Sequence, residues 1–230
     1  IKVRFESVCA SGKRHNVKIL IDAEESWIQD AVDDLVLELM ETFNTETLIV
    51  YSTLQTYRWD RLEYLKKIHV KAKQKNFKLG FKVVRGAYME KERQRAKEKG
   101  YKSPICDSKA ITDKLFNDTT QYSLSNLDTI HLFVGTHNEQ STHLAIELMK
   151  ACNISNNDPR VWFGQLYGMS DHISFNLAEH GYNVAKYVPF GPVKDVMPYL
   201  IRRAEENTSV AGQTSRELNL IKKEKQRRNV

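Results

Sequence analysis

Six short apolar runs, separated by amphipathic stretches, are the feature that most constrains the fold of this chain. The runs cover residues 17–22, 47–53, 79–86, 130–136, 160–166 and 183–190. Stretches with apolar residues at helical spacing cover 26–44, 58–76 and 141–152, and the strongly charged stretch 89–101 is typical of an exposed helix. Nearly continuous apolar runs are typical of strands in a parallel sheet that is covered on both faces. The pattern therefore predicts successive β/α units, in either a doubly wound sheet or a (β/α)8 barrel.

Polar residues at the strand ends favour the barrel. They are Asp22, Gln55, Arg85, Thr136 and Gln165. A barrel collects functional groups from every strand at one rim, whereas an open sheet gathers them at a switch point. No GxGxxG motif follows a predicted strand, which weakens the dinucleotide-fold alternative. We therefore predict an α/β barrel with about six of its eight β/α units in this chain, and we expect two further units before residue 1.

Composition and charge narrow the class of protein. The chain is 41% hydrophobic and 28% charged, and no apolar run approaches the ~20 residues of a membrane span. Of the net charge of +6, residues 216–230 carry +4, from six basic and two acidic side chains. The remaining +2 is spread over residues 1–215, which argues against a nucleic-acid surface. The tail KKEKQRR is typical of a solvated helix end, and the alternative is weak attraction to anionic lipid.

The cysteines, the histidines and the first residues argue against several kinds of site and targeting segment. The three cysteines lie far apart, and none belongs to a CxxC motif, which argues against a disulfide framework or a zinc site. No histidine spacing suits zinc either, so no metal is predicted. The first residues resemble neither a signal peptide nor a transit peptide, and their apolar spacing is typical of the end of a helix.

The predicted helix after Pro192 carries the most chemically informative pattern. Tyr199, Arg202, Arg203 and Glu206 follow i, i+3, i+4, i+7 spacing and would share one helix face. Adjacent guanidinium groups favour an anion between them, and a carboxylate matches their fork. From the spacing alone, a solvated charged face with an intrahelical Arg–Glu pair is the favoured interpretation.

Five motifs in fixed order give a more specific signal. They are IDAEES, VVRGAYMEKER, GTHN, QLYGM and YVPFGPVKDVMPYLIRRAEEN. Together, between Arg4 and Gln213, they resemble the proline dehydrogenase family, and its single-function branch rather than its bifunctional fusions. The resemblance implies a distorted (β/α)8 TIM-like barrel over residues 1–215, followed by a basic tail at 216–230. It also implies FAD at the carboxyl rim, oxidation of L-proline to pyrroline-5-carboxylate as the first step of proline catabolism, and electron transfer to a membrane quinone.

The resemblance implies a substrate pocket of seven residues. They are Arg202, Arg203, Tyr187, Tyr199, Leu166, Asp22 and Glu206. The two arginines would clamp the proline carboxylate, and the two tyrosines would form the pocket wall. Leu166 would pack on the pyrrolidine ring, and Glu206 would hold the arginine face near the cofactor. Asp22 would shape the pocket floor and pair with an arginine, or it would instead cap the next helix.

The resemblance also implies a set of cofactor-binding residues. They are Gln55, Lys82, Val84, Arg85, Gly86, Ala87, Thr136, His137, Asn138, Gln165 and Glu206. Lys82 would lie beside the flavin N1–O2 edge, and Arg85 would meet the pyrophosphate. Gly86 would allow close backbone approach because it has no side chain. His137 would contact the cofactor, or it would be a core histidine hydrogen-bonded to a backbone carbonyl.

Two other functions remain open at this point. One is a flavin-binding barrel without activity, and the other is a different barrel enzyme acting on an anionic substrate, such as an aldolase. The composition suggests a bacterial cytoplasmic protein, peripheral to the inner membrane, or a mitochondrial protein if the source is eukaryotic. No nucleic-acid partner is expected, and no oligomeric state is predicted.

Overall fold

The computed structural model describes residues 1–209, 219, 222–223 and 225–228. For residues 202–209 it describes the backbone alone. Two compact units make up the chain, Ile1–Lys186 and Tyr187–Val230, and each is described by itself. Among the described residues, no helix combines the length and the apolar character needed to cross a bilayer. In the same part of the chain, no group of three or more His, Cys, Asp or Glu residues is arranged to hold a metal ion.

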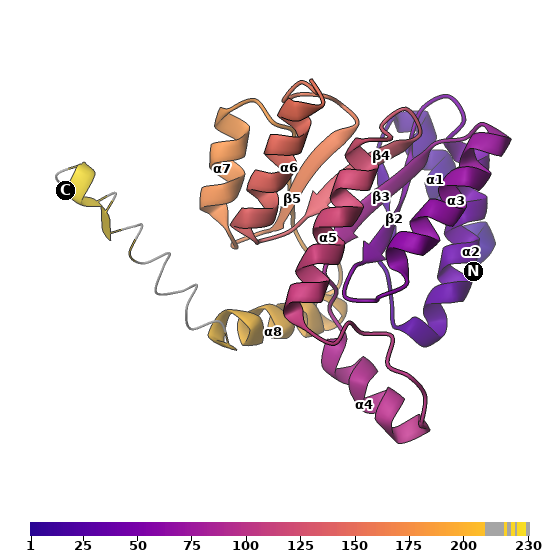
Figure 1. The fold of residues 1–230 in the computed structure, drawn as a ribbon, viewed down its shortest axis with the longest axis horizontal. Coiled ribbons are helices and arrows are strands. Elements are labelled where there is room, and N and C mark those ends of the chain that lie inside the picture. Colours follow the sequence, from indigo (N-terminus) through magenta and orange to yellow (C-terminus); the bar gives the residue numbers. More distant parts are fainter. Residues whose placement is uncertain (210–218, 220–221, 224, 229–230) are drawn as a thin grey trace. The chain divides into compact units, whose positions relative to one another are not determined.

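Strands and helices alternate along the chain (Figure 1). The strands are β1 (Ile19–Leu20), β2 (Val50–Gln55), β3 (Leu79–Val84), β4 (Ile130–Gly135), β5 (Val161–Leu166) and β6 (Val184–Tyr187). The helices are α1 (Lys2–His15), α2 (Ser26–Phe43), α3 (Arg61–Lys75), α4 (Met89–Lys99), α5 (Lys109–Leu124), α6 (Glu139–Ala151), α7 (Asp171–Glu179) and α8 (Val193–Ser209).

The six strands form one sheet in chain order, from β1 to β6. Pairing is parallel from β1 through β5, with Lys82 of β3 opposite Phe133 of β4, and Phe133 opposite Trp162 of β5. A doubly wound sheet would reverse its strand order part-way, and this one does not. The predicted barrel architecture is therefore confirmed, with six parallel strands curled into part of a distorted (β/α)8 barrel.

Side chains alternate between the two faces of the sheet. One face packs against the helices and forms the core. Its fully buried members include Leu54, Phe81, Val83, Leu132, Val134 and Phe163. Helix residues such as Val36, Leu39, Leu65 and Phe116 belong to the same cluster. The near-continuous apolar runs in the sequence thus correspond to strands whose helix-facing side is fully covered.

The opposite, inner face contains three glycines that make room for a large side chain on the preceding strand. The pairs are Tyr51 over Gly80, Val84 over Gly135 and Phe133 over Gly164. A Cβ atom on these glycines would lie 2.8, 2.9 and 2.1 Å from the respective neighbouring side chain. Such distances are too short for real contacts, so no side chain fits at these three positions, and at Gly80 the backbone oxygen of Val50 also lies 2.7 Å from the Cβ site.

Several helix predictions need correction. The sequence pattern missed α5 and α7, and it suggested only a helix end where α1 runs for 14 residues. The N-cap of α2 is Glu25, which makes no side-chain cap bond. Pro198 lies inside α8, five residues after the helix begins at Val193. A proline there removes one i→i−4 hydrogen bond.

His131 on β4 predicts a pH dependence of folding stability. Burial, with the positive charges of Lys18 and Arg160, lowers its pKa to about 4, and its Nδ1 has no hydrogen-bond partner in the described part of the chain. The unfolded chain, with a histidine pKa of ~6.5, binds the extra proton between these values. The free energy of unfolding should therefore fall as the pH drops from about 6.5 to 4, by at most about 3 kcal/mol from this group.

Urea unfolding at pH 7, 6, 5 and 4 would measure this effect. The variant His131→Phe should have a flatter pH profile over this window than the unmodified chain. The control His143→Phe replaces an exposed histidine on α6 and should leave the slope unchanged. Equal slopes in the unmodified chain and in His131→Phe would contradict a buried neutral His131.

Candidate active site

The carboxyl ends of β1 and β3 meet through an ion pair between Asp22 and Lys82. Lys82 lies on β3 opposite Thr53, and its side chain is 17% exposed, whereas that of Asp22 is 59% exposed. The sequence predicted an arginine partner for Asp22; in the described side chains, its partner is this lysine. The helix-cap alternative is wrong, because the N-cap of α2 is Glu25. A carboxylate and a cation therefore stand together at the inner rim of the sheet.

The end of β2 holds the loop that follows β1. Gln55 is the last residue of β2 and is 4% exposed, and its Nε2 donates to the carbonyl of Glu24 over 2.8 Å. Two residues earlier on β2, the Thr53 hydroxyl donates to the carbonyl of Ile21, also over 2.8 Å. These two bonds bracket Asp22 and fix its backbone beside β2.

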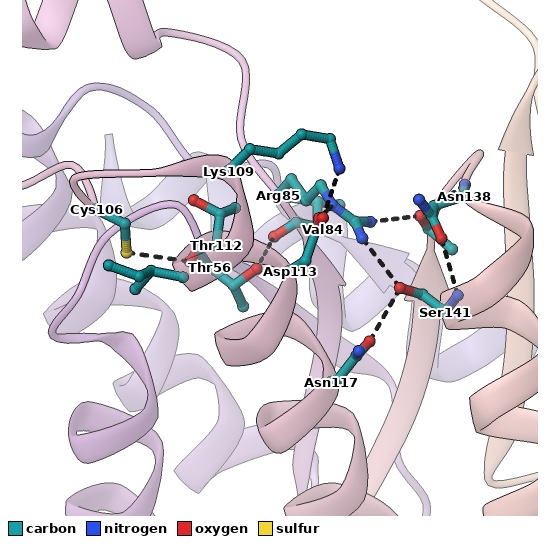
Figure 2. Close-up of polar contacts among 12 residues, drawn as sticks. Thr56, Val84, Arg85, Cys106, Lys109, Thr112, Asp113, Asn117, Asn138 and Ser141 are labelled. Carbon is teal, nitrogen blue, oxygen red and sulfur yellow. Dashed lines mark hydrogen bonds and ion pairs between the residues drawn. The ribbon is translucent and has the colours of Figure 1, made fainter.

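Arg85, directly after β3, lies at the centre of a hydrogen-bond network (Figure 2). Its Nε donates to Asp113 Oδ1 (2.7 Å), its Nη1 to Thr136 Oγ1 (2.9 Å) and its Nη2 to Ser141 Oγ (3.0 Å). The guanidinium carbon also lies 4.6 Å from the centre of the Phe116 ring. Three of its five N–H groups are thus used within the protein, which orients the guanidinium and leaves at most two for an outside anion.

The partners of Arg85 follow later in the chain, on α5, directly after β4 and on α6. Burial alone would raise the pKa of Asp113, but hydrogen bonds from Lys109 and Arg85 lower it below its usual value. Asn117 of α5 accepts a hydrogen bond from the Ser141 hydroxyl over 2.9 Å. The ionised carboxylate of Asp113 and the neutral groups around it therefore keep the Arg85 guanidinium in one place.

The residues directly after β4 lie at the rim of the sheet and also cap the start of α6. Asn138 is the N-cap of α6, and its Oδ1 accepts from Ser141 N over 2.9 Å. Its own N–H donates to Thr136 Oγ1 over 3.1 Å. His137 lies between them, and its Nδ1 is 3.0 Å from the hydroxyl of Ser170. A backbone carbonyl was the expected partner of a core histidine, whereas this bond is to a side chain.

Gln165 of β5 lies on the helix-facing side of the sheet. It is 2% exposed, its Nε2 donates to the carbonyl of Thr136 over 3.2 Å, and its Oε1 accepts from Ser174 of α7 over 2.8 Å. The side chain therefore joins β4, β5 and α7. The next residue, Leu166, ends β5 and is half-buried on the opposite face.

Gly86 allows the backbone after β3 to lie over an aromatic ring. Its φ is 138°, which side-chain-bearing residues rarely adopt, and a Cβ there would be 2.6 Å from the Tyr57 ring. Gly86 and Ala87 are exposed, and Val84 and Arg85 are half-buried. A segment with small side chains, next to cations at Lys82 and Arg85, suits a large anionic group that needs close backbone approach. The donor set therefore fits a flavin dinucleotide.

The second unit carries the helix with the paired arginines. The helical backbone of α8 places Tyr199, Arg202, Arg203 and Glu206 on one face, as the spacing predicted. The ring of Tyr187 lies 5.4 Å from that of Tyr199, centre to centre, at an angle of 53°. The side chains of the two arginines and of Glu206 lie outside the described part of the chain.

A family model described as proline dehydrogenase matches residues 1–216. This chain belongs to the proline dehydrogenase family. Among curated relatives, "Proline dehydrogenase 1, mitochondrial" of Drosophila melanogaster is 36% identical over 98% of this chain and 34% of its own length. The "Carbapenem antibiotics biosynthesis protein CarD" of Pectobacterium carotovorum subsp. carotovorum is 39% identical over 100% of this chain and 59% of its own length. The chain thus spans between one third and three fifths of these relatives.

Solved structures of the family have the same fold. The proline utilization A protein of Bdellovibrio bacteriovorus, inactivated by N-propargylglycine, matches with a TM-score of 0.84 and 26% identity. The match covers 91% of this chain and 22% of that protein. The six-stranded sheet described above therefore has the same fold as the matching part of that larger protein.

Sequence reasoning missed the residues that orient Arg85 in this proline dehydrogenase family member. Asp113 and Asn117 lie on α5, which was not predicted, and Ser141 lies in the first turn of α6. A local signal was present, because Ser108 precedes an apolar pattern and accepts a hydrogen bond from Ile111 N over 3.2 Å. Recognising that cap would have predicted α5, although not its contact with Arg85.

Proposed function

We propose that this chain is the catalytic barrel of a flavin-dependent proline dehydrogenase, which oxidises L-proline to pyrroline-5-carboxylate. The observation that carries the proposal is the set of polar groups at one rim: Lys82 paired with Asp22, and Arg85 held beside the exposed Gly86 backbone. Such a rim is where barrel enzymes keep their active sites. Membership of the proline dehydrogenase family and the names of the relatives support the choice of substrate.

FAD, when bound, would supply the acceptor for a hydride from proline C5. Lys82 would favour negative charge on the adjacent ring, and its pairing with Asp22 fixes the position of its ammonium group. Arg85 would contact the pyrophosphate with the N–H groups that the protein does not use. Gln55, Thr136, His137 and the backbone of residues 86–87 would line the rest of the cofactor site.

The substrate would be held by its carboxylate. Arg202 and Arg203 are adjacent on α8, and a carboxylate between them would relieve their mutual repulsion. Tyr187 and Tyr199, whose rings are already in contact, would exclude water from one side of the pyrrolidine ring. Leu166 would contact the ring's apolar face. The proton on the ring nitrogen would leave to water.

We infer that the electron acceptor is a membrane quinone and that the protein works at a membrane surface. Pyrroline-5-carboxylate formation releases two electrons, which need an acceptor outside the barrel. In a bacterium this surface would be the cytoplasmic side of the inner membrane, and in a eukaryote it would be a mitochondrial membrane. Several eukaryotic relatives are named as mitochondrial proline dehydrogenases, which supports the second placement for a eukaryotic source.

One absorbance experiment on the purified full-length protein tests this function. We expect a bound-flavin spectrum whose main visible band bleaches when L-proline is added without oxygen, and recovers with a quinone analogue. A flavin spectrum that proline leaves unchanged would support the inactive flavin-binding barrel instead. A colourless protein that does not take up added FAD would contradict the proposal and favour a different barrel enzyme.

A further inference from the structure

The highly charged helix α4 is fastened to the barrel mainly by polar contacts. Only two of its eleven residues are buried, Glu92 and Ala96. Glu92 is completely buried, at 0% exposure, and it is a carboxylate. A buried carboxylate is costly unless it is hydrogen-bonded, so its partners indicate what it does.

Both oxygens of Glu92 bind the first residue of α2. Its Oε1 accepts from the backbone N–H of Ser26 over 2.5 Å, and its Oε2 accepts from the Ser26 hydroxyl over 2.7 Å. The N–H groups of a first helical turn have no partner within the helix, and the helix dipole favours negative charge there. No side chain from the α2 N-cap residue fills this role. Glu92 therefore caps α2 from a helix 66 residues away in the sequence.

Neighbouring contacts join the same two segments. Lys91 forms an ion pair with Glu25, and the hydrogen bond from Lys91 lowers the pKa of Glu25 below its usual value. Two cationic side chains of α4 lie over the ring of Trp27 in α2. Arg95 is 4.3 Å and Lys91 is 5.5 Å from the ring centre. Nearly every contact that joins α4 to the start of α2 thus depends on charge.

These contacts lie between two parts of the rim. Glu92 follows Gly86 by six residues, and Ser26 follows Asp22 by four. The carbonyl of Glu24, between Asp22 and Ser26, is held from the other side by Gln55. The segment that carries Asp22 is therefore fixed at two points, by β2 and by Glu92.

We propose that Glu92 is a positioning residue for the active site. It holds residues 22–26 against the segment after β3, and so sets where the Lys82–Asp22 pair lies relative to the Gly86 backbone. Neither Glu92 nor Ser26 contacts the reacting groups. This inference rests on the proposed function, because its kinetic consequences concern flavin and proline.

The test compares Glu92→Ala, Glu92→Gln and the control Glu90→Ala in the full-length protein. Glu90 lies on the same first turn of α4 but is exposed. For Glu92→Ala we expect the flavin Kd and the proline KM each to rise at least tenfold, with kcat changing less. Glu92→Gln should recover part of this loss, because its carbonyl oxygen still accepts from Ser26 N–H. Glu90→Ala should match the unmodified protein.

Two further measurements separate positioning from general stability. Hydrogen exchange of the protein without flavin should become faster at residues 22–26 in Glu92→Ala, and stay unchanged in β4 and β5. Ser26→Ala, which removes only the hydroxyl bond, should weaken flavin binding in the unmodified background and have no added effect in Glu92→Ala, where that bond is already absent.

The outcomes distinguish this inference from the function on which it rests. If the unmodified protein binds no flavin, the proposed function fails. If it binds flavin and reacts with proline, but Glu92→Gln and a folded Glu92→Ala keep its Kd and KM, only the positioning role fails. Additive effects of Ser26→Ala and Glu92→Ala would likewise overturn it.

Discussion

Replacing Arg202 by methionine is expected to raise the KM for proline by roughly one to three orders of magnitude. The proposed clamp places the proline carboxylate between two guanidinium groups, and truncating one partner of a desolvated charge pair costs about 2–5 kcal/mol. Methionine keeps much of the length and the helix propensity of arginine, so α8 should still form. Because the contact is made in both the bound and the reacting states, kcat should fall less than kcat/KM.

Steady-state kinetics with proline, together with the Kd of a competitive carboxylate inhibitor, would measure this change. The matched control is Lys194→Met, which removes one exposed positive charge from the first turn of the same helix. It should leave KM within about twofold, since surface charges away from a site contribute little. An unchanged KM in Arg202→Met would rule out the clamp and favour the solvated-face interpretation.

A second large effect is expected at Arg85. In Arg85→Met, the flavin Kd should rise by about two orders of magnitude, because the anion would lose a charge-assisted contact and the rim would lose its organiser. Asp113 Oδ1, Thr136 Oγ1 and Ser141 Oγ would each lose a hydrogen bond. The free energy of unfolding should also decrease, by roughly 1–3 kcal/mol.

Flavin fluorescence titration and urea unfolding would separate the two effects. The control is Lys109→Met, because Lys109 binds the same Asp113 carboxylate but is itself largely exposed. This variant tests whether losing any one positive charge beside Asp113 is enough to weaken flavin binding. We expect it to leave the flavin Kd nearly unchanged. Equal flavin affinities in Arg85→Met and Lys109→Met would mean that Arg85 is a structural residue only.

The sequence predicted the barrel and its rim because both depend on local periodicity. Every predicted strand overlaps an observed one, and polar residues at strand ends must meet when the strands are parallel and in order. The same alternation predicts which face of the sheet carries Gln165. Its neighbours Gly164 and Leu166 lie on the inner face, so Gln165 must point to the helices.

Contacts between distant segments could not be predicted in this way. Asp113 reaches Arg85 from 28 residues away, and Glu92 reaches Ser26 from 66 residues away. Nothing in the spacing around Glu92 distinguishes it from the exposed Glu90, because both lie in a highly charged stretch. Their difference appears only when α4 packs beside the start of α2.

The glycines of the inner face constrain the order in which this sequence can evolve. Gly164 cannot gain a side chain while Phe133 remains, but Phe133 can become smaller first without a clash. Gly80 differs, because a Cβ there would also lie 2.7 Å from the backbone oxygen of Val50, which a smaller residue at Tyr51 would not remove. Substitutions at Phe133 and Gly164 should therefore be correlated, with the change at Phe133 preceding the change at Gly164. For this pair of strands, the order of substitutions in evolution should therefore follow the order of the strands along the chain.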